Sequence, residues 1–250
     1  MGQLVKITEC ESSTLFGMNG GQPESPDALR LVYARKKDLT NAESGQTEIW
    51  ICDRDLNNHR NVFTVECGNH NGPSATFVDN SRIVFRDIID GFSAFRILNI
   101  DTGEVEFGPV FCKESHCSEN GIYPFSVSEE FLGKNPQIPE IDTCGIYLLN
   151  LHTYQVTKAV ESSQILEMVK KAGYTPNRYT TSMSHVQLNP SATAVMMRLS
   201  VEECRTFGAL GAVELETGKT HFIPDKPVHQ LWYDDSTYMA TRQYFDGKKI

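Results

Sequence analysis

Two histidines of this chain stand in matching surroundings. His185 and His229 each lie five residues before a polar turn, and an arginine follows each one thirteen residues later, Arg198 and Arg242 respectively. A neutral imidazole nitrogen is a good ligand for Mn, Fe, Zn or Ni, and Gln187 offers an amide oxygen beside the first histidine. The spacing predicts either a divalent metal site shared by both histidines or structural hydrogen bonds between neighbouring strands.

The residues around these histidines belong to a repeated pattern of turns and strand-like runs. The segments 98–103, 149–154 and 213–218 each place a short polar turn between alternating apolar runs, which indicates a β-hairpin. A second polar turn, which enters a strand, lies upstream of each hairpin. The anchor residues of this second turn are Pro26, Asp79, Glu129, Pro190 and Asp234.

The anchors recur about every 50 residues, which is the length of a four-stranded propeller blade. The pattern therefore predicts an all-β fold, a β-propeller with about four and a half blades visible, as part of a seven-bladed ring. Residues 1–250 would form a single domain that is C-terminally incomplete, with a helical insertion at 163–172, where apolar residues have helical spacing. The alternatives are a complete five-bladed ring and another antiparallel architecture such as a sandwich.

Two segments of the chain, 184–190 (SHVQLNP) and 228–235 (VHQLWYDD), resemble the oligogalacturonate lyases. These are β-propeller enzymes whose blades open with His-x-Gln-x-x-Pro and with His-x-x-Trp-x-x-Asp-Gly. In that family, histidines and a glutamine hold a divalent metal that binds the uronate carboxylates of the substrate. The resemblance implies that His185, His229 and Gln187 are metal ligands and that the cofactor is a divalent ion, with manganese expected.

The resemblance is specific over residues 184–235, and the rest of the chain shares only the blade pattern of TolB-type propellers. The related ulvan-lyase propellers act on another uronate polymer with Tyr, His and Arg side chains. The oligogalacturonate lyases carry a further histidine near the turn of the second signature, where this chain has Tyr233 and Asp234.

A lyase of this kind removes the proton next to a carboxylate, so it needs a base and a group that stabilises the developing negative charge. The candidate catalytic residues are histidine or tyrosine bases in loops before the inner strands and arginines in or near the two signatures. The bases are His70, His116 and Tyr123, and the arginines are Arg178, Arg198 and Arg242.

Composition and charge restrict the other functions. The 250 residues carry a net charge of −9, which argues against a broad nucleic-acid or anionic-membrane surface. No run approaches the roughly 20 apolar residues of a membrane span, and the first residues lack the apolar core of a signal peptide. The seven scattered cysteines fit a reducing compartment, so a cytoplasmic location is expected. The sequence does not indicate an oligomeric state.

Two functions fit these observations. The first is a lyase that cleaves a uronate-containing polysaccharide or oligosaccharide by metal- or arginine-assisted β-elimination, with an acidic oligosaccharide as its partner. The alternative is a non-catalytic, TolB-like propeller that binds or scaffolds, in which the same histidines are structural.

Overall fold

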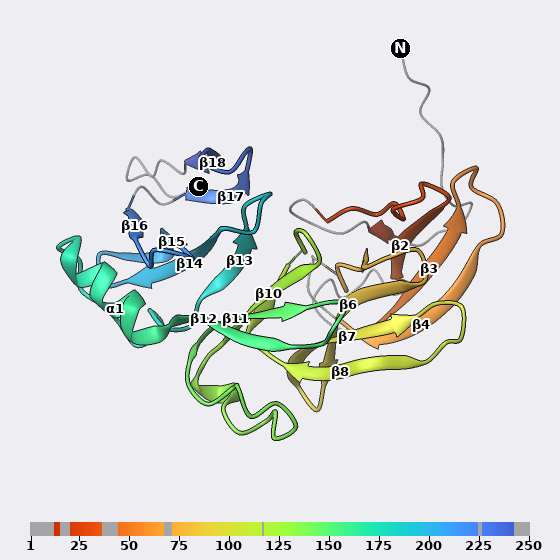
Figure 1. Cartoon of the computed structure of the whole chain (residues 1–250), viewed down its shortest axis with the longest axis horizontal. Coiled ribbons are helices and arrows are strands. Elements are labelled where there is room, and N and C mark those ends of the chain that lie inside the picture. Colours follow the sequence, from red (N-terminus) through yellow and green to blue (C-terminus); the bar gives the residue numbers. More distant parts are fainter. Residues whose placement is uncertain are drawn as a thin grey trace, which may run out of the picture. The chain divides into compact units, whose positions relative to one another are not determined.

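The computed structural model describes residues 13–15, 21–36, 45–67, 72–116, 118–224 and 227–242, with the main chain alone at 13–15, 204–207, 227–228 and 242. It divides into two compact units, Met1–Val110 and Phe111–Ile250 (Figure 1). Both units consist mainly of antiparallel β-sheets whose strands pair in chain order. The all-β class is therefore confirmed, and the sheets are consistent with propeller blades. The number of blades and the closed ring stay predictions.

The first unit holds two four-stranded sheets. The strands of the first sheet are β1 (Ser13–Leu15), β2 (Arg30–Lys36), β3 (Gln46–Asp53) and β4 (Arg60–Glu66). The strands of the second sheet are β5 (Thr76–Phe77), β6 (Arg82–Ile89), β7 (Phe92–Asn99) and β8 (Val105–Phe111). Alternate residues of these strands are buried in one apolar cluster, because successive side chains of a strand point to opposite faces.

The second unit holds two more four-stranded sheets and a strand pair. The third sheet contains β9 (Glu114–Ser115), β10 (Ile122–Val127), β11 (Gly145–Asn150) and β12 (Val156–Glu161), with a short 3₁₀ helix at Glu129–Phe131. The fourth sheet contains β13 (Ser184–Leu188), β14 (Ala194–Val201), β15 (Cys204–Glu214) and β16 (Thr220–Ile223). The pair is β17 (Pro227–Trp232) with β18 (Tyr238–Arg242).

A single α-helix, α1 (Ser162–Lys171), connects β12 to β13 in the described part of the chain. Ile165, Met168 and Val169 have the i, i+3, i+4 spacing of an apolar stripe, and all three are buried. Gly173 ends the helix with φ +82°, a left-handed conformation that suits glycine. The helix thus occupies the segment for which apolar spacing predicted it.

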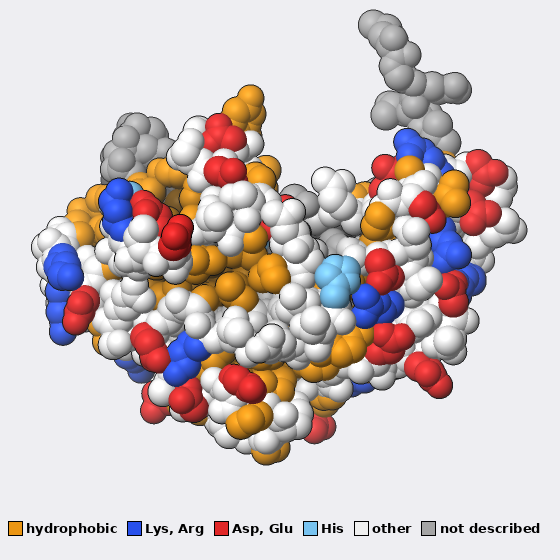
Figure 2. Space-filling model, in the orientation of Figure 1, with side chains coloured by type: hydrophobic (Ala, Val, Ile, Leu, Met, Phe, Trp, Pro, Cys, Tyr) orange, Lys and Arg blue, Asp and Glu red, His pale blue; other side chains and the backbone are white. Residues whose placement is uncertain are grey.

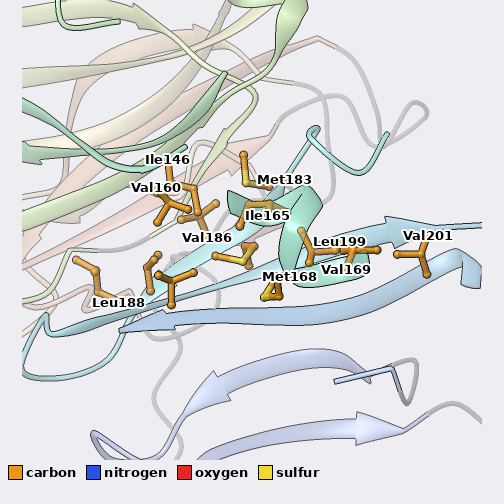
Figure 3. Close-up of a cluster of buried hydrophobic side chains, with 13 residues drawn as sticks. Ile146, Val160, Ile165, Met168, Val169, Met183, Val186, Leu188, Leu199 and Val201 are labelled. Carbon is orange, nitrogen blue, oxygen red and sulfur yellow. The ribbon is translucent and has the colours of Figure 1, made fainter. Parts of the chain in front are cut away.

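The third and fourth sheets and α1 share one apolar core (Figure 3). Ile146 and Val160 enter it from β11 and β12, Ile165 enters it from the helix, and Val186 and Met197 enter it from β13 and β14. Burying side chains of this size stabilises a fold by roughly 1.5–3 kcal/mol each. This core holds the inner strands β9 and β13 beside each other.

The inner strand of the fourth sheet and strand β17 contain the same bulge. His185 and His229 have positive φ values of 53° and 52°, and the strand register shifts at both residues. Ser74, two residues before β5, also has a positive φ, of 44°. Histidine is one of the non-glycine residues that tolerate this left-handed conformation, and a bulge redirects the side chain that it carries. The two histidines therefore occupy equivalent places in their sheets, as their spacing predicted.

In each unit, one pair of neighbouring sheets is joined by the same turn-to-turn hydrogen bond. The amide of Asp27 donates to Asn80 Oδ1 at 3.0 Å in the first unit, and the amide of Ser191 donates to Asp235 Oδ1 at 2.8 Å in the second. Each of these residues directly follows an anchor of the repeat. The repeat therefore sets contacts between sheets as well as the strands within one sheet.

The third repeat is where the predicted anchor is wrong. The sequence pattern predicts its anchor at Glu129, whereas the turn that enters the second strand β10 is formed by residues 118–121, where the amide of Glu119 donates to the carbonyl of Ile122. Glu129 lies in the 3₁₀ helix that follows β10. With the corrected turn, the residue equivalent to His185 is Ser115 rather than Pro124.

The surface drawn in Figure 2 carries acidic and basic side chains interspersed with one another, and its hydrophobic side chains gather over the region of β13–β16. Interspersed charges produce no large field of one sign on the described part of this face. Within the residues that the structure describes, no helix is long and apolar enough to cross a bilayer.

Gly208 tests the close pairing of β14 with β15. Its φ is +53°, and a Cβ atom there would overlap the main-chain oxygen of Leu199. Gly133 is the matched control, because its φ is +75° and a Cβ would meet nothing within 4 Å. We expect Gly133→Ala to lower the free energy of unfolding by about 1 kcal/mol, the cost of the left-handed backbone, and Gly208→Ala to lower it by about 3 kcal/mol or more. Urea denaturation measures both, and equal losses would contradict the pairing.

Candidate metal centre

Glu114, His116 and His185 form a cluster of metal-ligating side chains in the second unit. One candidate ligand atom from each residue lies within 4.8 Å of the other two. His116 Nε2 lies 3.1 Å from Glu114 Oε1, and His185 Nδ1 lies 3.6 Å from Glu114 Oε2. The two imidazole rings have centroids 5.0 Å apart and an interplanar angle of 44°. Ligands of one ion at metal–ligand distances of about 2.1 Å lie about 3–4 Å apart, so these side chains could hold one ion.

The hydrogen bonding of His116 supports this possibility. The side chain is fully buried, and neither Nδ1 nor Nε2 has a hydrogen-bond partner within the described residues. The approach of Nε2 to Glu114 lacks the angular geometry of a hydrogen bond. A buried polar atom without a partner costs about 1–3 kcal/mol, so such a ring demands a ligand, an ion or a water. Two imidazoles and one carboxylate form a donor set that suits Mn, Fe or Zn.

The short inner strand β9 and the residue directly after it supply two of the three side chains. Glu114 and His116 are two residues apart, which is the spacing of residues on one face of a strand. Ser115 between them is buried and accepts a 2.9 Å hydrogen bond from the hydroxyl of Tyr123 on β10. Tyr123 is itself fully buried. Of the predicted base residues, the structure therefore brings His116 to this cluster. Tyr123 bonds to Ser115, which lies on the opposite face of the strand from Glu114 and His116.

The bulge of β13 supplies the third side chain. The backbone of His185 is left-handed, and its ring Nδ1 lies 3.3 Å from the hydroxyl of Ser184. Its main-chain carbonyl accepts a 3.3 Å hydrogen bond from the side-chain Nε2 of Gln230 on β17. The side chain of His185 is 21% exposed, which leaves the cluster a route to solvent.

Arg198 is the predicted arginine that the structure places near the cluster. It pairs with Ser184 across β13 and β14, and its Nη2 donates to Gln230 Oε1 at 3.2 Å. Burial lowers the pKa of its guanidinium, and the negative charge of Glu114 acts in the opposite direction. Arg198 and Ser184 also line a hollow of about 240 Å³. An arginine in this position can bind an anion that reaches the cluster.

The other two predicted ligands lie differently. Gln187 is buried, and its Nε2 donates to the carbonyl of Gln230 at 3.2 Å, while its Oε1 has no hydrogen-bond partner among the residues described. An amide oxygen in that state remains available as a ligand, so the assignment of Gln187 stays a prediction. His229 is exposed and does not belong to the cluster that holds His185. The structure thus brings His185 close to His116, while His229, the equivalent of His185 in the next repeat, is exposed to solvent.

The remaining predicted catalytic residues lie away from the cluster or outside the described structure. Arg178 is exposed, with its guanidinium carbon 4.5 Å from the centre of the Tyr179 ring. Arg198 pairs with Ser184, one residue before His185, whereas Arg242 pairs with Pro227, two residues before His229. The two arginines therefore differ by one residue in their register against the histidine strands. The side chain of Arg242 and the whole of His70 lie outside the described residues, and their roles stay predictions.

Glu114 is the cluster residue that sequence reasoning missed. The signal was the Glu-x-His spacing at 114–116, because residues two apart on a strand share a face. An anchor at Glu129 places the inner strand of the third repeat in the wrong segment and leaves His116 in a loop before that strand. In a loop, this spacing carries no such meaning.

The comparisons with known proteins concern the fold. No protein-family model and no curated protein sequence matches this chain. Among solved structures, the matches include the β-propeller folds of TolB and of oligogalacturonate lyase. TolB from Acinetobacter baumannii overlaps with a TM-score of 0.53 and 9% identity, covering 89% of this chain and 47% of that one. An oligogalacturonate lyase from Vibrio parahaemolyticus overlaps with a TM-score of 0.52 and 11% identity, covering 97% of this chain and 63% of that one.

A third structure, an oligogalacturonate lyase in complex with manganese, overlaps less well, with a TM-score of 0.45 and 13% identity over 79% of this chain and 50% of that one. At these identities the similarity shows a shared fold and no shared chemistry. The chain spans less than two thirds of the length of each of these three structures.

Metal analysis tests the cluster. We expect the purified protein, dialysed after incubation with Mn²⁺, to retain close to one ion per chain. Glu114→Gln and His185→Asn should weaken binding by at least about tenfold, because each removes one ligand; asparagine also tolerates the left-handed backbone of position 185. His152→Asn is the matched control, since His152 is exposed in the same unit and outside the cluster. Elemental analysis measures the ion content, and equal retention by all four proteins would contradict a metal centre here.

Proposed function

We propose that this protein is a divalent-metal-dependent lyase that cleaves a uronate-containing oligosaccharide by β-elimination. The observation that carries the proposal is the cluster of Glu114, His116 and His185, in which His116 is fully buried and both of its ring nitrogens lack a hydrogen-bond partner within the described residues. The similarity of the fold to a solved oligogalacturonate lyase is compatible with this function. The resemblance of segments 184–190 and 228–235 to that family adds the substrate class.

The chemistry requires that negative charge be stabilised beside the carbon that loses its proton. When bound, a divalent ion supplies Lewis-acid stabilisation to a substrate carboxylate. Glu114, His116 and His185 would bind the ion, and the carboxylate of Glu114 offsets part of its charge. The guanidinium of Arg198 would orient the carboxylate of the sugar in the hollow that it shares with Ser184.

The reaction balances without an oxidant or a reductant. A base removes the proton from the ring carbon next to the carboxylate, and the electron pair of that C–H bond forms a double bond to the neighbouring carbon. The glycosidic C–O bond on that neighbouring carbon breaks, and the leaving oxygen takes a proton. Of the base candidates, Tyr123 is buried and bonded to Ser115, and His116 belongs to the ligand cluster. Neither is therefore assigned as the base, and the prediction for His70 stays open to test.

The alternative function is a non-catalytic module that binds or scaffolds, as the TolB-like reading of the sequence predicts. The observation in its favour is the extent of the fold similarity to TolB, with a TM-score of 0.53 over 89% of this chain. In this case Glu114 pairs with the two histidines as a structural ion pair between the third and fourth sheets, and no metal or substrate is needed.

Near-ultraviolet absorbance distinguishes the two functions, because β-elimination creates an unsaturated uronate that absorbs there. We expect the protein with Mn²⁺ to produce this absorbance from oligogalacturonate or from ulvan oligomers, and a chelator to abolish the rate until Mn²⁺ is restored. Arg198→Met should lower kcat/KM by about 100-fold with the metal content unchanged, since it removes the charge that orients the carboxylate. Lys170→Ala, a change of an exposed cation on α1, is the matched control.

The outcomes separate the two functions. A protein that holds no metal and yields no product from any uronate polymer would favour the non-catalytic module. Product formation that survives both the chelator and Arg198→Met would overturn the roles assigned to the cluster and to the arginine.

A further inference from the structure

An exposed tyrosine and an exposed arginine stand together on the turn before β13. The side chain of Tyr179 is 52% exposed, which is unusual for a large ring, and the guanidinium of Arg178 lies 4.5 Å from the centre of that ring. Within the described chain no carboxylate pairs with Arg178. An aromatic ring beside a cation that has no carboxylate partner is a common arrangement for holding a charged sugar, because the ring packs against C–H groups and the guanidinium binds a carboxylate.

The turn that carries this pair is firmly anchored to β14. Asn177 Nδ2 donates to the hydroxyl of Ser200 at 3.0 Å, and the hydroxyl of Thr180 donates to the carbonyl of Ser200 at 2.6 Å. Thr180 is fully buried. These hydrogen bonds, one on either side of residues 178 and 179, hold the main chain of the pair in place, so a ligand would meet a preorganised turn.

Two hollows meet at this turn. The smaller, of about 240 Å³, is lined by Arg198 and Ser184 as well as Tyr179, and the hydroxyl of Ser184 lies 3.3 Å from His185 Nδ1. The larger, of about 430 Å³, is lined by Arg178 and Lys113. Both include Tyr179 and Ser182. Together they form a path that begins beside the ligand cluster and continues past the exposed ring.

The charges along the larger hollow are mixed. Glu129 and Glu130 also line it, and Lys113 Nζ lies 3.3 Å from Glu130 Oε1, so this pair is largely neutralised. Arg178 is therefore the cation there that remains for a ligand carboxylate. Glu129 provides oxygens that accept hydrogen bonds from sugar hydroxyls.

We infer that Arg178 and Tyr179 form a subsite for a second uronate residue of an acidic oligosaccharide, next to the residue that is cleaved at the metal centre. The ring of Tyr179 stacks on the C–H face of that sugar, and Arg178 binds its carboxylate. The inference rests on the proposed lyase function for the identity of the substrate. It predicts a dependence on chain length, because only an oligomer that extends past Ser184 reaches the subsite.

Binding to metal-free protein tests the subsite without any turnover. Calorimetric titration with galacturonate and with its oligomers up to the hexamer, in chelator and at low salt, should give an affinity that rises with length for the wild type. Tyr179→Ala should weaken hexamer binding by about tenfold, since a stacked ring contributes roughly 0.5–1.5 kcal/mol beyond its burial, and should leave the binding of the monomer unchanged. Tyr179→Phe should keep the affinity because it keeps the ring. Arg178→Ala should weaken hexamer binding by about tenfold at low salt and less at high salt.

The chain offers matched controls. Tyr233 is 69% exposed and lines neither hollow, so Tyr233→Ala should bind the hexamer as the wild type does. Lys170→Ala serves the same purpose for Arg178→Ala. A neutral maltohexaose should bind more weakly than the uronate hexamer, and Arg178→Ala should not change its binding.

Each outcome decides either the subsite or the lyase function. Equal hexamer affinities for the wild type, Tyr179→Ala and Arg178→Ala would overturn the subsite, even if product forms in the near-ultraviolet assay. Hexamer binding that depends on Tyr179, in a protein that yields no unsaturated product with Mn²⁺, would establish the subsite and overturn the lyase. Absence of hexamer binding to the wild type would overturn the subsite.

Discussion

The apolar core shared by the third sheet, the fourth sheet and α1 is the constraint on which the candidate site depends. Ile146, Val160 and Val186 pack in this core, and the hydroxyl of Ser126 on β10 donates to the carbonyl of Met183 at 2.7 Å, just before β13. Because these contacts hold β9 beside β13, a carboxylate from one sheet and an imidazole from the next lie within 4 Å of each other. A mutation that disrupts this packing would therefore move the candidate ligands apart, even though each ligand residue itself is unchanged.

Burial then gives the cluster its chemistry. In the interior, a carboxylate beside imidazoles interacts more strongly than it would in water, and a polar atom without a partner becomes costly. His116 shows both effects, since it is fully buried beside Glu114 with two ring nitrogens that lack hydrogen bonds within the described residues. His185 differs because the bulge leaves it partly exposed. His116 can thus bind an ion on its buried side, while His185 stays accessible to a ligand that enters from solvent.

Sequence patterns predicted the β class, the hairpins and the helical segment, because periods of two and of 3.6 residues are local signals. They also predicted that His185 and His229 are equivalent, and the bulges at both positions bear this out. The patterns failed at β9, which is only two residues long and therefore shows no alternation. That failure hid Glu114. The partnership of His116 with His185 joins residues 69 positions apart in the chain and arises from sheet packing, which no local pattern reports.

The hydrogen bond that joins the turns of neighbouring sheets has a consequence for how such chains change over evolution. The amide of Ser191 meets Asp235 just as the amide of Asp27 meets Asn80, so the first and fourth repeats present the same connector to the sheet that follows them. The third repeat meets the fourth through a related bond, in which Asn120 Nδ2 donates to the carbonyl of Pro190 at 3.0 Å. Stability in such an array is approximately a sum over adjacent repeats. A site formed by two consecutive repeats, as the cluster of Glu114, His116 and His185 is, can therefore be inherited as one unit together with the contacts between its two sheets.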